Sequence, residues 1–341
     1  MTMSILKPKI IAEIGNSHEG SLGIALSMID MAAKSGADIV KFQIHFSEFE
    51  STKYEPFRTS NFKQDKTRSD YWNRVNFSAN EWYKIVEYCE TKKIEFMCSP
   101  FSTEAAHFLF KNGLVKRWKI GSGEISNLPL LEFVFGTNFD VLLSTGLTDE
   151  KLLGKVISFI DQRFNLDKLI LMHCVSQYPT NLSHTAMSLI DEYSQKYKVR
   201  VGHSDHSGII STSIFALTLP IEFLEVHLTP NNLFFGPDTS SSLTPEELAF
   251  VVNFRNDLHE IKKSYFTRDQ LFEMSRQTAE IFRKSLYWAA NFDQGDIVKQ
   301  SSFVVRKPWK GIDAFEANSI VGKTLTRKVI KGDPIQESDI E

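Results

Sequence analysis

The sequence predicts a (β/α)₈ barrel followed by a small β-rich domain, and three observations point to this architecture. Eight short, β-rich apolar runs recur over about the first 230 residues, helical segments lie between them, and the last sixty residues contain little helix. Strands that alternate with helices and are apolar along their whole length indicate a parallel sheet covered on both faces. Eight such units match a barrel, which usually takes about 200–400 residues.

The eight runs start 22 to 30 residues apart, with one longer step of 56 residues. Apart from that step, each interval fits one strand, one helix and two loops. An open, doubly wound sheet shares this local pattern. We favour the barrel because the count reaches eight and no glycine-rich dinucleotide fingerprint follows a strand. The predicted strands are residues 10–15, 39–44, 95–100, 117–122, 140–145, 169–174, 199–204 and 223–228.

Helix signals mark the segments between the strands. Apolar residues recur at helical spacing over 21–36, a stretch that ends in glycine. Ser78 with Glu81 forms a capping box before a helix that we expect to run to about residue 93. Thr244 with Glu247 forms a second capping box before the last barrel helix, and that helix has a proline at its first position.

The rest of the chain falls outside this alternation. The long step, residues 46–77, is polar and aromatic without periodicity, and such a loop is usually a functional lid or an interface element. Near the end, QGDIV is echoed by KGDPI, which suggests two similar half-units in a small β module. We therefore expect a barrel domain over 1–265, a linker helix over 266–283 and a β domain over 284–341.

Composition narrows the class of protein. The 341 residues carry 39 Lys and Arg against 42 Asp and Glu, a net charge of −3, which argues against nucleic acid or an anionic membrane as the main partner. The three cysteines (Cys89, Cys98 and Cys174) are too few and too scattered for a disulfide framework or a cysteine-based zinc site. No apolar run approaches the ~18 residues of a membrane span, and the N-terminus lacks the apolar core of a signal peptide. We expect a soluble, cytoplasmic protein.

The strand ends carry the polar residues on which function depends, because barrel enzymes place their chemistry there. Six of the nine histidines fall at predicted strand ends. Lys41, Lys119 and a ring of serines suit an anionic, oxygen-rich substrate such as a phosphate or carboxylate. His206 and His227 end neighbouring strands and could share one divalent metal. The alternatives are hydrogen-bonded rim histidines and rim salt bridges for the lysines.

The segments at these ends form a pattern. In order they are EIGNSHEG (13–20), KFQ (41–43), SPF (99–101), KIGSGE (119–124), LSTG (143–146), HCVSQYPT (173–180), GHSDH (202–206), EVH (225–227) and GPD (236–238). Together they resemble the sialic acid synthase family, whose members make N-acetylneuraminic, legionaminic or pseudaminic acid. The tail resembles the C-terminal antifreeze-like (SAF) β-clip domain of that family, and the resemblance covers nearly the whole chain.

The resemblance implies a TIM-barrel enzyme that condenses phosphoenolpyruvate with an N-acylated hexosamine, either N-acetylmannosamine or a diacetamido-trideoxyhexose. The products would be a nine-carbon 2-keto acid and phosphate. It implies Mn²⁺ as cofactor, with Mg²⁺ or Co²⁺ as alternatives, and a domain-swapped homodimer in which the β-clip of one protomer covers the partner's site. The implied residues are Glu13, Glu124 and Lys119 for catalysis; Lys41, Ser99, Lys119, Ser122, Ser144, Ser176 and Ser204 for phosphoenolpyruvate; Gln43, Tyr178, Asp238 and Lys307 for the sugar; and His206 and His227 for the metal.

Three departures from the family pattern affect mainly the sugar end. Ser17 stands where the family has Asn before His18, and Ser176 stands at a position that is often Asn. In the tail, the family's R-P-x-x-G signature is replaced by the run from Arg306 to Gly311. Two alternatives stay open: a related phosphoenolpyruvate–aldose condensing enzyme with a different sugar, and a catalytically silent binding protein of the same fold.

Overall fold

The structure is a computed structural model that describes residues 6–59 and 64–341. The chain divides into two compact units between Lys263 and Ser264. Within the described ranges, no helix is both long enough and apolar enough to cross a membrane.

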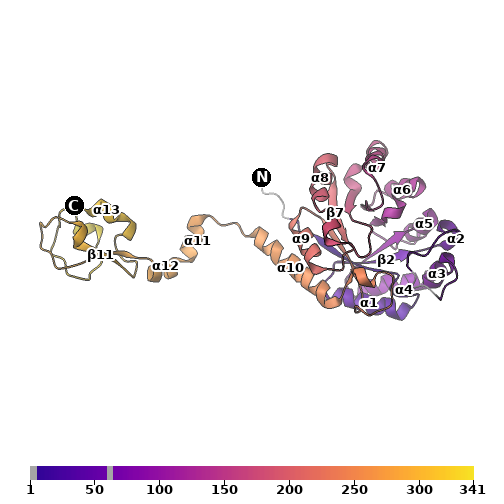
Figure 1. Ribbon diagram of the computed structural model, residues 1–341, viewed down its shortest axis with the longest axis horizontal. Coiled ribbons are helices and arrows are strands. Elements are labelled where there is room, and N and C mark those ends of the chain that lie inside the picture. Colours follow the sequence, from indigo (N-terminus) through magenta and orange to yellow (C-terminus); the bar gives the residue numbers. More distant parts are fainter. Residues whose placement is uncertain (1–5, 60–63) are drawn as a thin grey trace. The chain divides into compact units, whose positions relative to one another are not determined.

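The first unit confirms the predicted barrel. Eight parallel strands are hydrogen-bonded in the order β3-β2-β1-β8-β7-β6-β5-β4, so the sheet curves into a nearly closed ring with β3 and β4 at the ends of the path (Figure 1). A short ninth strand, β9 (Ser242–Leu243), pairs with β8. The barrel strands are β1 (Lys9–Gly15), β2 (Ile39–Ile44), β3 (Glu95–Pro100), β4 (Trp118–Ile120), β5 (Val141–Ser144), β6 (Leu169–His173), β7 (Arg200–Asp205) and β8 (Phe223–Leu228).

A helix follows each strand and covers the outside of the ring (Figure 1). The two predicted capping boxes are confirmed: Ser78 accepts from Glu81 N before α4, and Thr244 and Glu247 bond reciprocally before α10. These caps satisfy backbone N–H groups that have no partner inside the helix. The barrel helices are α1 (Leu22–Lys34), α4 (Ala79–Thr91), α5 (Thr103–Lys111), α6 (Leu128–Gly136), α7 (Glu150–Arg163), α8 (Ser188–Tyr197), α9 (Ile210–Thr218) and α10 (Pro245–Lys263).

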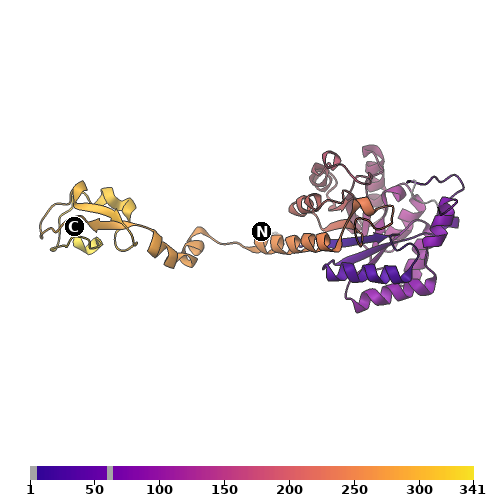
Figure 2. The ribbon, with the colours of Figure 1, turned by 60° about the horizontal axis from the view of Figure 1, so that its bottom comes forward.

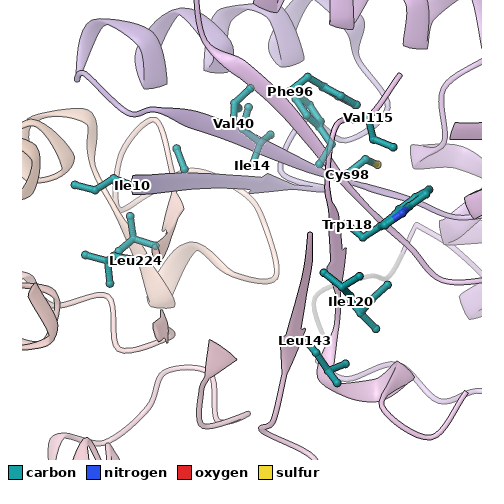
Figure 3. Packing of buried hydrophobic residues seen from close by; sticks show 14 of the residues in the cluster. Ile10, Ile14, Val40, Phe96, Cys98, Val115, Trp118, Ile120, Leu143 and Leu224 are labelled. Carbon is teal, nitrogen blue, oxygen red and sulfur yellow. The ribbon is translucent and has the colours of Figure 1, made fainter. Parts of the chain in front are cut away.

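Alternation along the strands separates two cores. Outward residues such as Ile10, Val40 and Trp118 pack against the helices in one large cluster (Figure 3). The inward residues form a smaller cluster that fills the barrel interior: Ile11, Ile39, Met97, Leu142, Ile170, Met172 and Phe223. Gly202 belongs to this interior, where a Cβ would lie 2.4 Å from Met172 Sδ, so glycine leaves room for the methionine.

The next inward positions toward the carboxyl ends of the strands are polar. On β1, Glu13 follows Ile11 two residues later, and on β2 Lys41 follows Ile39. The sheet register pairs Glu13 with Lys41 on one side and with His227 on the other. Because side chains alternate with a period of two, the apolar interior and the polar mouth are successive layers of one face.

The long step between β2 and β3 contains two short helices, α2 (Ser47–Glu50) and α3 (Arg68–Val75). Tyr71, Trp72 and Val75 of α3 form a small apolar cluster with Phe57. The described parts of 46–77, which we call the lid segment, therefore have a core of their own. Residues 60–63, which belong to the same predicted lid, lie outside the described residues.

The second unit has its own hydrophobic core. Its strands β10 (Ser285–Trp288) and β11 (Phe303–Arg306) form an antiparallel pair, seen at the orange-to-yellow end of the chain in Figure 2. The QGDIV and KGDPI segments each bury one apolar residue in this core, Val298 in the first and Ile335 in the second. The segment expected as a single linker helix is instead divided at Ser275 into α11 (Arg268–Met274) and α12 (Arg276–Phe282).

Candidate active site

A cavity of about 560 Å³ opens at the carboxyl ends of the barrel strands. It is lined by residues from most strands, by the loops that follow them and by the lid segment. Fourteen of the fifteen predicted site residues line it: Glu13, Lys41, Gln43, Ser99, Lys119, Ser122, Glu124, Ser144, Ser176, Tyr178, Ser204, His206, His227 and Asp238. The fifteenth, Lys307, belongs to the second unit.

Two lysines and two glutamates alternate across the floor of this cavity. Lys41 Nζ lies 2.8 Å from Glu13 Oε2 and 3.7 Å from Glu225 Oε1, while Lys119 Nζ lies 3.7 Å from Glu225 Oε2. All four residues are at most 3% exposed, so each charge needs a partner. We call this set the lysine–glutamate array.

Burial and pairing act in opposite directions on these groups. Burial disfavours the cation at Lys41, but Glu13 and Glu225 outweigh it and raise the pKa of Lys41. At Lys119 burial prevails and lowers the pKa, with Glu225 opposing it and Lys41 adding to it. Burial also opposes ionisation of Glu225, yet Lys119 and Lys41 lower its pKa to about 2. Glu225 is therefore the carboxylate that both lysines share.

Serine hydroxyls surround the two ammonium groups. Lys41 Nζ donates to Ser99 Oγ at 3.3 Å and Lys119 Nζ donates to Ser144 Oγ at 2.7 Å. Ser204 Oγ donates to Glu225 Oε1 at 3.0 Å. At the rim, the hydroxyls of Ser122 and Ser176 lie 3.0 Å apart. Buried cations with hydroxyl donors form a suitable receptor for phosphate and carboxylate oxygens.

The two histidines predicted as metal ligands lie together on β7 and β8, with ring centroids 5.3 Å apart. His206 Nδ1 donates to the Val175 carbonyl at 2.8 Å, which leaves Nε2 as the acceptor that faces the cavity. Burial, aided by His227, lowers the pKa of His206 to about 3, so the ring is neutral. In the described part of the chain, no three His, Cys, Asp or Glu side chains form a ready-made metal cage. Two neighbouring imidazoles fit a divalent ion whose other ligands are water or substrate oxygens.

Glu13 is held from its other side by an amide. Gln43 Nε2 donates to Glu13 Oε1 at 2.7 Å, and Gln43 Oε1 accepts from Asn16 Nδ2 at 3.2 Å. Glu124 lies farther out, in the turn Ser122–Glu124 after β4, and accepts from Asn127 Nδ2 at 2.7 Å. Partial burial raises the pKa of Glu124. The structure thus brings Glu13 to the centre of the cavity and Glu124 to its wall.

Several lining residues were missed at the sequence level. Arg58 of the lid segment stacks on the Tyr178 ring, with its Cζ 4.4 Å from the ring centroid, and forms an ion pair with Asp238. Trp72 lines the same wall. These residues come from the segment without periodicity, and no sequence signal placed them at the mouth. Glu225 did carry a signal, because it lies two residues before His227 and so shares its inward face.

The predicted sugar contact Lys307 is described within its own unit only. Lys307 Nζ lies 5.0 Å from the centroid of the Phe282 ring. Nearby, the Trp309 ring is stacked under the Arg283 guanidinium at 4.0 Å. Within the cationic cluster from Arg306 to Lys310, Lys307 is therefore backed by an aromatic side chain of its own unit.

Comparison with known proteins decides the family. Residues 28–269, which make up most of the chain, match the model of the NeuB family. This protein belongs to the NeuB family. The match includes seven of the eight barrel strands and the lid segment.

Relatives of this NeuB protein carry synthase names. It is 28% identical over 336 residues to an N,N′-diacetyllegionaminic acid synthase of Campylobacter jejuni, covering 97% of this chain and 99% of the relative. It is 29% identical over 337 residues to the human N-acetylneuraminate-9-phosphate synthase, covering 97% and 92%. Among solved structures, an N-acetylneuraminic acid synthetase from Leptospira borgpetersenii is 28% identical with a TM-score of 0.69, covering 82% of this chain and 96% of that one.

Proposed function

We propose that this NeuB protein is a nonulosonic acid synthase. It would condense phosphoenolpyruvate with an N-acylated hexosamine to give a nine-carbon 2-keto sugar acid and phosphate. The observation that carries this proposal is the lysine–glutamate array inside the barrel, ringed by serines and adjoining two histidines. Relatives named as legionaminic and N-acetylneuraminate-9-phosphate synthases support the same activity.

The inner half of the cavity suits phosphoenolpyruvate. Lys41 and Lys119 supply two buried cations, and Ser99, Ser144 and Ser204 supply hydroxyls within hydrogen-bond reach of them or of Glu225. These groups would bind the phosphate and carboxylate oxygens and neutralise the charge that gathers on phosphate as the C2–O bond breaks. Ser122 and Ser176 would complete the site at the rim.

Glu13 has the position of a base at the reacting carbon. When C3 of the enol phosphate bonds to the aldehyde carbon of the sugar, the aldehyde oxygen takes a proton and C2 becomes cationic. A water then adds to C2 and gives up one proton. The C2–O bond to phosphate breaks, the remaining hydroxyl proton passes to the phosphate, and the 2-keto group forms. Glu13, at the centre of the cavity, would orient that water and take its proton, while Lys41 and Gln43 hold the carboxylate in place.

The outer half would bind the sugar. Gln43, Tyr178 and Asp238 line this end, and Arg58 reaches it from the lid segment. His206 and His227 would hold Mn²⁺, or Mg²⁺ or Co²⁺, which when bound polarises the aldehyde as a Lewis acid. Glu124 on the cavity wall would assist proton transfer at the sugar.

We further propose that the second unit is an antiparallel β-clip of the SAF type that covers the site of a partner in a domain-swapped homodimer. Its antiparallel strands and its own core support this assignment. Lys307 would then contact the sugar of the partner's site, in place of the arginine usual in the family.

A related synthase that uses another aldose is the second candidate. Its support is the fold shared with a 3-deoxy-D-arabino-heptulosonate 7-phosphate synthase from Thermotoga maritima, which has a TM-score of 0.55 at 13% identity. Because that likeness concerns fold alone, it favours no particular sugar.

One experiment separates the candidates. Phosphate release from phosphoenolpyruvate is measured with N-acetylmannosamine, a diacetamido-trideoxyhexose and unacylated aldose phosphates as co-substrates. We expect release with an acylated hexosamine. Release only with an aldose phosphate would support the second candidate, and release with none would point to a silent binding protein.

A further inference from the structure

His45, which directly follows β2, is buried beside the carboxylate proposed as the base. Its imidazole is stacked between Trp72 and Phe101, with ring centroids 3.7 and 4.3 Å away. Both ring nitrogens have a partner: Nδ1 lies 2.6 Å from Glu50 Oε1, and Nε2 lies 3.3 Å from Gln43 Oε1. Only 2% of the His45 side chain is exposed, so these contacts set its orientation.

The neighbours of Gln43 fix the direction of these hydrogen bonds. Gln43 Nε2 donates to Glu13 Oε1, because a carboxylate oxygen can accept only from the amide nitrogen. The amide oxygen therefore points to Asn16 and His45, and Asn16 Nδ2 donates to it. The ring of His45 thus faces the Glu50 carboxyl at Nδ1 and the Gln43 amide oxygen at Nε2, and an N–H at Nε2 donates to that oxygen.

We infer that His45, paired with Glu50, is a positioning residue that holds the Gln43 amide and, through it, the Glu13 carboxylate. The order of contacts is Glu50, His45, Gln43, Glu13, with each step at 3.3 Å or less. This inference rests on the proposed role of Glu13. It adds a second support to that carboxylate, opposite the Lys41 ion pair, so that both oxygens are held before substrate arrives.

Two substitutions separate hydrogen bonding from packing in the full-length enzyme. His45→Phe keeps the stacking and removes both ring nitrogens, whereas His45→Gln gives up the stacking and keeps an N–H that can reach Gln43. We expect His45→Phe to lower kcat by roughly 3- to 10-fold, the loss of one hydrogen bond. The KM for phosphoenolpyruvate should stay unchanged, and His45→Gln should retain more activity than His45→Phe. His107→Asn, at an exposed histidine of α5, is the control and should behave as wild type.

A second measurement needs no turnover and so separates this inference from the proposed function. NMR of the side-chain amides in the substrate-free enzyme should show the Gln43 amide resonance shifted in His45→Phe and in Glu50→Gln, and unchanged in His107→Asn. An unchanged Gln43 resonance in both variants, or a His45→Phe variant more active than His45→Gln, would overturn the inference. If no sugar supports phosphate release while the Gln43 resonance responds to these changes, the proposed function fails and the arrangement around Glu13 stands. Should the Phe variant not fold, the Glu50→Gln spectrum decides.

Discussion

Glu13 is fixed by two different kinds of neighbour, an ammonium on Oε2 and an amide on Oε1. Glu13→Gln keeps the shape and leaves Lys41 paired with Glu225. We therefore expect phosphoenolpyruvate binding to survive while kcat falls by ~10²-fold or more, because the base is lost. Steady-state kinetics and direct titration of phosphoenolpyruvate test this. An unchanged kcat with a raised KM for the sugar would show that Glu13 only binds substrate.

Arg58 supplies, from the barrel unit itself, a guanidinium at the proposed sugar end of the cavity. It is bound to Asp238 and stacked on Tyr178, so its removal disturbs two predicted sugar contacts at once. Arg58→Ala should raise the sugar KM roughly tenfold, the loss of one charge-assisted hydrogen bond, and leave the KM for phosphoenolpyruvate unchanged. Arg163→Ala, at an exposed ion pair on α7, serves as the control. A change in the phosphoenolpyruvate KM alone would contradict this placement.

At the scale of elements, the turn after β5 is packed without spare room. A Cβ on Gly146 would lie 2.3 Å from Ser176 Oγ and 2.9 Å from Cys174 Sγ. Gly146→Ala should cost about 1–3 kcal/mol of unfolding free energy through overpacking, and it should raise the KM for phosphoenolpyruvate by displacing Ser176. Gly154→Ala in the middle of α7, where a Cβ meets nothing within 4 Å, should instead stabilise the protein by about 0.5–1 kcal/mol. Urea unfolding of both variants measures the contrast, and equal effects would refute it.

The elements also show what could be predicted from sequence. Strand positions and helix caps follow from patterns within a few residues, so the barrel and its polar strand ends were predictable. Glu13 and Lys41 were proposed for the mouth because they stand near the carboxyl ends of predicted strands, and both line the cavity. Arg58 and Asp238 are 180 positions apart and meet only through tertiary packing, so no local pattern links them. The helix break at Ser275 was missed because the stretch from 268 to 282 reads as continuously helical, and the Ser275 side chain makes no capping hydrogen bond at the start of α12.

At the scale of the whole molecule, the proposed homodimer makes a complementation test available. Lys307→Ala should raise the sugar KM, because its cation would serve the partner's site, and Glu13→Gln disables the site of its own barrel. Mixed dimers of these two inactive or impaired variants would contain one intact composite site. We expect activity to recover partly on mixing after reversible dissociation, up to about a quarter of wild type, because random pairing makes half of the dimers hybrids and each hybrid has one intact site of two. Absence of any recovery in mixtures that contain hybrid dimers would contradict the shared site.

The lysine–glutamate array has a thermodynamic consequence for the order of assembly. Its two cations balance its two carboxylates, so the net charge of the array before substrate binds is close to zero. Phosphoenolpyruvate brings one carboxylate and a phosphate of about −1.5 to −2 charge, which leaves a buried surplus of negative charge. A divalent ion between His206 and His227 would offset most of that surplus. Phosphoenolpyruvate and the metal ion should therefore each increase the binding affinity of the other. By reciprocity the two enhancements are equal, and we expect about tenfold in each direction. Calorimetric titration of phosphoenolpyruvate with and without Mn²⁺, and of Mn²⁺ with and without phosphoenolpyruvate, measures both factors. If the two bind independently, the array accommodates the charge of phosphoenolpyruvate without the metal ion.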